Sequence, residues 1–140
     1  MRRDLGSGYD VDDDRGRLDR GAIHAYLTTE YWAFGRTRER QDELIDASGH
    51  VIGLYHEGRQ AGFARAVDCD AARFVYLADV YVLPEHRGRG LGAELVREII
   101  EHGPYAGRTW ILHTRDAGTL YERFGFHRYE RLMQRDSGAP

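Results

Sequence analysis

Several features that would identify a protein class are scarce or missing in this sequence. Cys69 is the only cysteine, so an intrachain disulfide cannot form. There is no apolar segment of the length that a signal peptide or a membrane span requires, so we expect a cytoplasmic protein without a membrane partner. The formal net charge of -3 lacks the excess of basic residues that binds a phosphate backbone, which argues against a nucleic-acid partner.

The length and apolar content predict one compact domain. A chain of 140 residues, 41% of them hydrophobic, can bury one sizeable core, and neither a repeat nor an interdomain linker is visible. We expect the domain to span residues 9–135. Residues 1–8 are predicted to be flexible, and residues 136–140 to form a tail.

Hydrophobic periodicity and capping residues indicate the order of the elements. Helices are predicted over 19–29, 37–47, 92–102 and 117–123. Strands are predicted over 9–12, 51–56, 61–68, 73–82, 109–113 and 126–134. The apolar strand 73–82 is expected to be buried on both faces, and its crossover through the long helix implies a parallel neighbour at 109–113.

The most specific stretch is the turn Arg87-Gly88-Arg89-Gly90-Leu91-Gly92, between an apolar strand and an amphipathic helix. Alternating glycines let the backbone take left-handed torsions, and no Cβ keeps a ligand away from the N–H groups. A helix N-terminus attracts anions, and the two arginines add charge-assisted hydrogen bonds. The turn therefore predicts a site for a diphosphate.

Three other interpretations of this turn were considered. A nucleoside-triphosphate loop is excluded, because Leu91 follows Gly90 where such a loop has lysine. A dinucleotide fingerprint fits the glycine spacing, but Arg108 lies where the ribose-binding acid is expected. A purely structural turn explains one or two glycines, but it does not explain the arginines beside them.

Two motifs in order carry a family resemblance. Arg87-x-x-Gly90-x-Gly92, which follows the segment 80–86, resembles the acetyl-CoA pyrophosphate motif of the GNAT superfamily of N-acetyltransferases. The segment 120–126, Leu-Tyr-Glu-Arg-Phe-Gly-Phe, resembles the later motif of that family. The resemblance implies an α/β (α+β) fold with a mixed, largely antiparallel sheet flanked by helices. It also implies a parallel strand pair that splays at the site of the acetyl-CoA cofactor.

The resemblance also implies roles for individual residues. Tyr121 is the expected general acid, which protonates the leaving thiolate if its pKa is modestly lowered. Thr114 stands where many members of the family carry a cofactor-binding asparagine. The cofactor contacts implied for this chain are Val80, Tyr81, Val82, Arg87, Gly88, Arg89, Gly90, Leu91, Gly92 and Thr114.

The acceptor side of the site is less specific in the sequence. Asp79 is the second catalytic candidate, as a base if burial raises its pKa, or otherwise as an attractor of a cation while water relays the proton. His113 and His56 are the alternative bases, and His113 also lies near the expected acceptor. Tyr31 and Trp32 are candidate substrate walls, although core-covering aromatics would fit equally well.

These features together predict an acetyl-CoA-dependent N-acetyltransferase. It would act on a primary amine of a small-molecule or amino-acid-like acceptor, by direct attack in a ternary complex. Asp79 and Asp116 favour a cationic acceptor. The alternative is a non-catalytic acyl-CoA-binding sensor or interaction module of the same fold. Homodimer formation is left open, and no metal is predicted because the histidines and Cys69 lack metal-ligand spacing.

Overall fold

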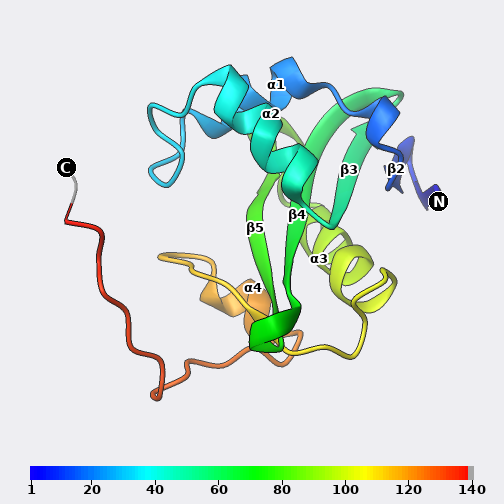
Figure 1. Cartoon of the computed structure of the whole chain (residues 1–140). Helices are drawn as coiled ribbons and strands as arrows, with labels where there is room; N and C mark the ends of the chain where they lie inside the picture. Colours follow the sequence, from blue (N-terminus) through cyan, green and yellow to red (C-terminus); the bar gives the residue numbers. More distant parts are fainter. Residues whose placement is uncertain (139–140) are drawn as a thin grey trace.

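The computed structural model describes residues 1–138 and forms one six-stranded sheet in the order β1-β2-β3-β4-β5-β6 (Figure 1). The first five strands pair antiparallel, whereas β5 and β6 are parallel and are joined through a helix. The strands are β1 Arg3–Gly6, β2 Tyr9–Asp12, β3 His50–His56, β4 Arg59–Cys69, β5 Phe74–Val82 and β6 Trp110–Ile111. This mixed, largely antiparallel sheet confirms the predicted fold class.

Helices cover both faces of the sheet, and their ends agree with the capping signals. The helices are α1 Arg20–Leu27, α2 Arg38–Ala47, α3 Leu91–Glu101 and α4 Gly118–Glu122. The Asp19 side chain accepts a hydrogen bond from the Ala22 N–H at 3.0 Å, and Thr37 accepts one from the Arg40 N–H at 3.1 Å. Among residues 1–138, no helix is long and apolar enough to cross a membrane.

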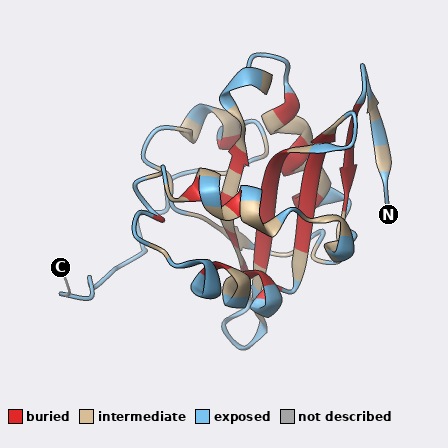
Figure 2. Cartoon of the chain, turned by 90° about the horizontal axis from the view of Figure 1, so that it is seen from above, coloured by how far each residue is buried: buried red, intermediate tan, exposed pale blue. Residues whose placement is uncertain are grey.

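Alternation along the strands divides the core into two layers, seen as buried strands between the helices in Figure 2. Val51 and Phe63 pack with α1 and α2, while their neighbours Ile52 and Ala64 pack with α3 and Tyr121 of α4. Each face of the sheet therefore has its own hydrophobic core. The sheet therefore fixes α1 and α2 on one face and α3 and α4 on the other, on either side of β5.

The two parallel strands separate soon after they pair. Only Val75 with Trp110 and Tyr76 with Ile111 are paired between β5 and β6, although β5 continues to Val82. This short pairing agrees with the predicted splayed strand pair. Opposite Ala64 the register of β5 against β4 shifts, and Asp79 takes a left-handed conformation with φ 55°. The shift is a β-bulge, which redirects the backbone at this edge.

Burial along β5 differs from the prediction. Buried and half-buried residues alternate from Phe74 to Val82, whereas burial on both faces was expected. The reason is the separation from β6, because half-buried residues such as Ala78, Val80 and Val82 line a pocket there. An apolar strand pattern reports a low-polarity environment without distinguishing a packed core from the wall of a cavity.

Both ends of the chain also differ from the prediction. Residues 3–6 were expected to be flexible, but they form β1, paired with β2 and held by a 2.6 Å ion pair from Arg3 Nε to Glu98 Oε2. Residues 126–134 form no strand, because β6 has only two paired residues and offers little edge to pair with. This part of the chain leads away from the body of the fold (Figure 1). Of the predicted tail, residues 136–138 are irregular, and 139–140 lie outside the described residues.

Candidate active site

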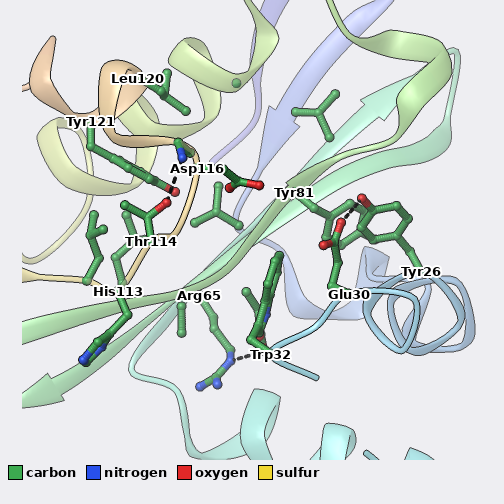
Figure 3. Close-up of a pocket in the computed structure, with 18 of the residues that line it drawn as sticks. Tyr26, Glu30, Trp32, Arg65, Tyr81, His113, Thr114, Asp116, Leu120 and Tyr121 are labelled. Carbon is green, nitrogen blue, oxygen red and sulfur yellow. Dashed lines mark hydrogen bonds and ion pairs between the residues drawn. The ribbon is translucent and has the colours of Figure 1, made fainter. Parts of the chain in front are cut away.

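A cavity of about 710 Å³ lies where β5 and β6 separate, and it extends to the turn before α3 and to the connection between α1 and α2 (Figure 3). It brings together residues predicted for the cofactor, for catalysis and for the acceptor. Those residues are Tyr31, Trp32, Asp79, Val80, Tyr81, Val82, Arg87, Gly88, Gly90, Leu91, Gly92, His113, Thr114 and Tyr121. Arg89 is the exception: it is exposed and does not line the cavity.

The turn before α3 has the backbone form that the sequence predicts. Gly88 and Gly90 have φ values of 80° and 76°, and Gly90 is the N-cap of α3. A Cβ added at either glycine would meet nothing within 4 Å, so packing does not require glycine here. The left-handed backbone conformation favours glycine at both positions, and the open space beside the helix N-terminus suits a bound phosphate.

Arg87 is held beside this turn by Val82 and by Tyr26, a residue that the sequence did not identify as part of the site. Its Nε donates to the Val82 carbonyl at 2.9 Å, and its Nη2 donates to the Tyr26 hydroxyl at 2.6 Å. The Tyr26 hydroxyl donates in turn to Glu30 at 2.5 Å. Burial raises the pKa of Tyr26, and the bond to Glu30 adds to this, so Tyr26 stays protonated and connects Arg87 to α1.

Asp79 lies in a buried ion cluster at the opposite end of the cavity. Its Oδ2 accepts hydrogen bonds from Arg65 Nε at 2.7 Å and from Arg36 Nη1 at 2.8 Å, and its Oδ1 accepts one from Trp32 Nε1 at 2.9 Å. The side chain of Asp79 is 1% exposed. Trp32 is therefore fixed by its indole N–H, with its ring at the cavity wall.

This cluster changes the role expected of Asp79. Burial alone raises the pKa of the Asp79 carboxyl, but the charges and hydrogen bonds of Arg65 and Arg36, with Trp32, outweigh it and hold the pKa below its usual value. The prediction needed burial to raise this pKa for Asp79 to act as a base. With the opposite direction, the carboxylate stays ionised and is already occupied by three donors, so it is a poor proton acceptor.

Tyr121 is placed by α4 at the cavity, on the opposite side from Trp32 and Arg65 (Figure 3). Its ring packs edge to face with Phe126, with centroids 5.7 Å apart. The hydroxyl makes no hydrogen bond to any residue that the structure describes. Burial raises the pKa of Tyr121 to about 12, and Asp116 adds to the increase, whereas the sequence argument expected a modest lowering.

The remaining candidates have partners that limit their chemistry. His113 Nδ1 contacts the Tyr76 hydroxyl and its Nε2 contacts Gln134 Oε1 at 2.7 Å, so both ring nitrogens are engaged. His56 stacks against Tyr9 and does not line the cavity. Thr114 accepts a hydrogen bond from the Ala117 N–H at 3.0 Å, which helps to begin α4.

Comparison with known proteins identifies the family and supports the fold. The acetyltransferase (GNAT) domain model matches residues 47–128, which contain β4, β5, the turn and α3. The chain belongs to the GNAT acetyltransferase family. Members of this family generally use acetyl-CoA, and acetyl transfer is therefore the general activity that the family supports.

Individual relatives of this GNAT protein span most of its length. One relative is a Xanthomonas campestris pv. campestris protein assigned to the GNAT family, whose crystal structure is known. Its sequence is 39% identical to this one, and the two structures have a TM-score of 0.83 over 91% of this chain and 92% of that chain. A Gibberella zeae protein named as an acetyltransferase is 30% identical over 76% of this chain and 72% of its own. The mycothiol acetyltransferase of Nocardia farcinica is 33% identical over 89 residues, 63% of this chain but only 29% of that protein.

Several cavity residues were missed by the sequence argument. Arg65 lies within the apolar strand β4, where a single charge at a buried position was the available signal. Arg36, Tyr26 and Glu30 lie in or next to the segment between α1 and α2. The sequence around these residues indicated only the faces of a helix and a connecting segment. Local spacing does not show which side chains from distant parts of the chain will come into contact.

The buried cluster predicts a stability change for Asp79→Asn. The variant leaves Arg36 and Arg65 facing each other without a carboxylate, so the free energy of unfolding should fall by about 3–5 kcal/mol at neutral pH. Urea unfolding measures this change. Asp42→Asn is the control, because its ion pairs with Arg20 of α1 and Arg38 of α2 are partly exposed to solvent, and their loss should cost less than about 1 kcal/mol.

The same cluster predicts a pH dependence. The folded pKa of Asp79 lies below its ordinary value of 3.8, so the stability that it contributes is present above pH 3.8 and is lost as pH falls through the folded value. The gap in stability between the native protein and Asp79→Asn should therefore narrow in acid. A gap of constant size down to acid unfolding would contradict this assignment.

Proposed function

We propose that the protein transfers an acetyl group from acetyl-CoA to the primary amine of a small acceptor, by direct attack in a ternary complex. The observation that carries this proposal is one continuous cavity. It joins the turn at Gly88–Gly90, where we place the phosphates, to Tyr121 and to the wall at Trp32 and Asp79. Both reactants can therefore be present together, which a direct transfer requires.

The residues present fit the proposed cofactor. The backbone amides of the turn and Arg87 would hold the diphosphate, and the edge of β5 at Tyr81 and Val82 would hold the pantetheine arm. The room beside Gly88 and Gly90 agrees with this assignment. Acetyl-CoA, when bound, supplies an acetyl group that is activated as a thioester. The Tyr81 ring is buried and stacks on Tyr26, so only its backbone is available for this contact.

Three groups of the chain would carry the chemistry. Val80 directly follows Asp79, whose backbone is left-handed. We assign the Val80 N–H as the hydrogen-bond donor to the thioester carbonyl oxygen, on which negative charge develops during attack. Asp79 and His113 have their acceptor atoms engaged, so water in the open cavity removes the proton from the attacking amine. Asp79 then acts as a positioning residue, which fixes Trp32 at the acceptor wall.

Tyr121 would assist departure of the thiol as a hydrogen-bond donor. With a pKa of about 12 it is fully protonated at neutral pH. Complete transfer of its proton to a thiolate with a pKa of about 8.5 would be uphill by about 5 kcal/mol at 1.36 kcal/mol per unit. A hydrogen bond to the developing thiolate carries no such cost. The sulfur therefore receives its proton in the end from water or from the acylated amine.

The proposed role of Tyr121 predicts the effect of Tyr121→Phe. Removing a hydrogen bond to a charged group costs about 1.5–3 kcal/mol, so kcat should fall by roughly 10- to 150-fold. Release of free thiol in the presence of an amine measures kcat, and circular dichroism checks that the fold is retained. A kcat close to that of the native protein would rule out contact with the sulfur.

The proposed diphosphate site predicts weaker cofactor binding in Gly90→Ala. A Cβ in the open space beside Gly90 should raise the Kd of coenzyme A by roughly tenfold, because it obstructs hydrogen bonds to the charged phosphates. Calorimetry measures this Kd. Gly107→Ala is the matched control: Gly107 has φ 82°, nothing within 4 Å of an added Cβ, and no place in the cavity. If both variants raised the Kd of coenzyme A equally, the increase would come from backbone strain and not from obstruction of the phosphate site.

Turnover itself separates the proposed enzyme from a binding module of the same fold. Protein incubated with acetyl-CoA and a panel of small primary amines should release thiol in proportion to the amine. A protein that binds coenzyme A but gives no amine-dependent thiol with any member of the panel would be a sensor or docking module.

A further inference from the structure

The acceptor wall of the cavity contains more positive than negative charge. Arg36 and Arg65 both contact the same oxygen of Asp79, and all three residues line the cavity. The other acceptors of the two guanidinium groups are neutral: Gln41 Oε1 at 2.9 Å for Arg36, and Ser48 Oγ at 3.4 Å for Arg65. One carboxylate thus faces two cations, which leaves this cluster with an excess of one positive charge. Glu30 also lines the cavity, but it accepts a hydrogen bond from Tyr26, which contacts Arg87.

This excess charge is largely shielded from solvent, because Arg65 is buried and Arg36 is half-buried. The side chains of Arg36 and Arg65 are 15% and 9% exposed, and neither forms an ion pair with a second carboxylate among residues 1–138. A buried charge without a counter-ion is unfavourable, whereas an anion entering from the cavity would compensate it. The Nη2 group of each arginine donates no hydrogen bond to the described residues, so donors remain for such an anion.

The opposite side of the cavity has the reverse charge. Asp116 lines the cavity beside Thr114 and Tyr121, away from Trp32 and Arg65 (Figure 3). Asp116 also adds to the raised pKa of Tyr121, after burial, which agrees with its place beside the hydroxyl. An acceptor amine that approaches the proposed sulfur position would therefore meet negative charge, and the other end of the same molecule would meet the arginines.

From this arrangement we propose that the acceptor carries an oxyanion, a carboxylate or a phosphate, which Arg36 and Arg65 bind beside the ring of Trp32. The inference rests on the proposed acetyl transfer and names the class of its substrate: a dipolar amine with a negatively charged group. It replaces the expectation of a purely cationic acceptor, because the charge of Asp79 is already neutralised by the two arginines.

Matched pairs of acceptors test the charge requirement. Each of several α-amino acids is compared with its carboxamide, and O-phosphoethanolamine is compared with ethanolamine, by the rate of acetyl-CoA-dependent thiol release. The anionic member of a pair should have a kcat/KM higher by at least about tenfold, the effect of a hydrogen bond between charged groups. The pair with the larger ratio tells whether the oxyanion is a carboxylate or a phosphate.

The variant Arg36→Gln tests whether this cluster binds the negatively charged group of the acceptor. It leaves Asp79 paired with Arg65 and Trp32, so the protein should fold, and unchanged affinity for coenzyme A verifies this. It should raise KM by about tenfold for the anionic acceptor only, with kcat nearly unchanged. Arg36→Lys should restore part of the preference. Arg38→Gln is the control, because Arg38 is half exposed on α2 and lies outside the cavity.

The possible outcomes separate the two proposals. Equal turnover of charged and neutral acceptors, or a preference that Arg36→Gln leaves intact, would overturn the charge requirement while acetyl transfer stands. Thiol release with none of the amines would overturn acetyl transfer to small amines, and the charge requirement with it.

Discussion

The carboxylate of Asp79, held by Arg65, Arg36 and Trp32, is the interaction on which one wall of the cavity, the proposed acceptor side, depends. It joins strand β4, strand β5 and the connection between α1 and α2 through one buried group. The left-handed conformation of Asp79 accompanies the bulge that redirects β5. Because an unpaired charge is costly when buried, these four side chains stabilise one another in a single arrangement, and the cavity wall has a fixed shape.

The cofactor side is built on a different principle. At the turn before α3, the groups proposed to bind the cofactor are backbone amides at a helix N-terminus, and glycine leaves the space beside them open. Glycine at positions 88 and 90 permits the left-handed torsions, while Arg87 is anchored by Val82 and Tyr26. The early end of the pairing between β5 and β6 then connects this turn to the acceptor wall. One half of the site thus depends on main-chain geometry and the other on buried charge.

Burial determines what each ionisable group can do. It raises the pKa of Tyr121 to about 12, because few groups nearby favour the phenolate. The same effect acts on Asp79, but two arginines and an indole N–H outweigh it. Tyr121 is therefore a hydrogen-bond donor and Asp79 a permanent anion at neutral pH. The direction of either shift depends on neighbours from other strands and helices, so residue type alone could not provide it.

The sequence by itself determined the parts that are contiguous. Local properties, namely the glycines and arginines of the turn, the amphipathic pattern of α3 and the caps of α1 and α2, predict the order of the elements. The family resemblance carried by the turn and the later motif implies the fold class. The phosphate site at the turn stays a prediction. The segment containing Tyr121 was recognised because its motif is continuous as well.

Tertiary structure alone decided which distant side chains meet. Arg65 and Arg36 reach Asp79 across 14 and 43 residues of sequence, and no spacing rule connects them. It also decided that residues 3–6 join the sheet while residues 126–134 do not, since strand pairing needs an available edge as well as a suitable sequence. Local periodicity fixes an element, whereas burial, charge balance and free edges exist only once the elements are packed.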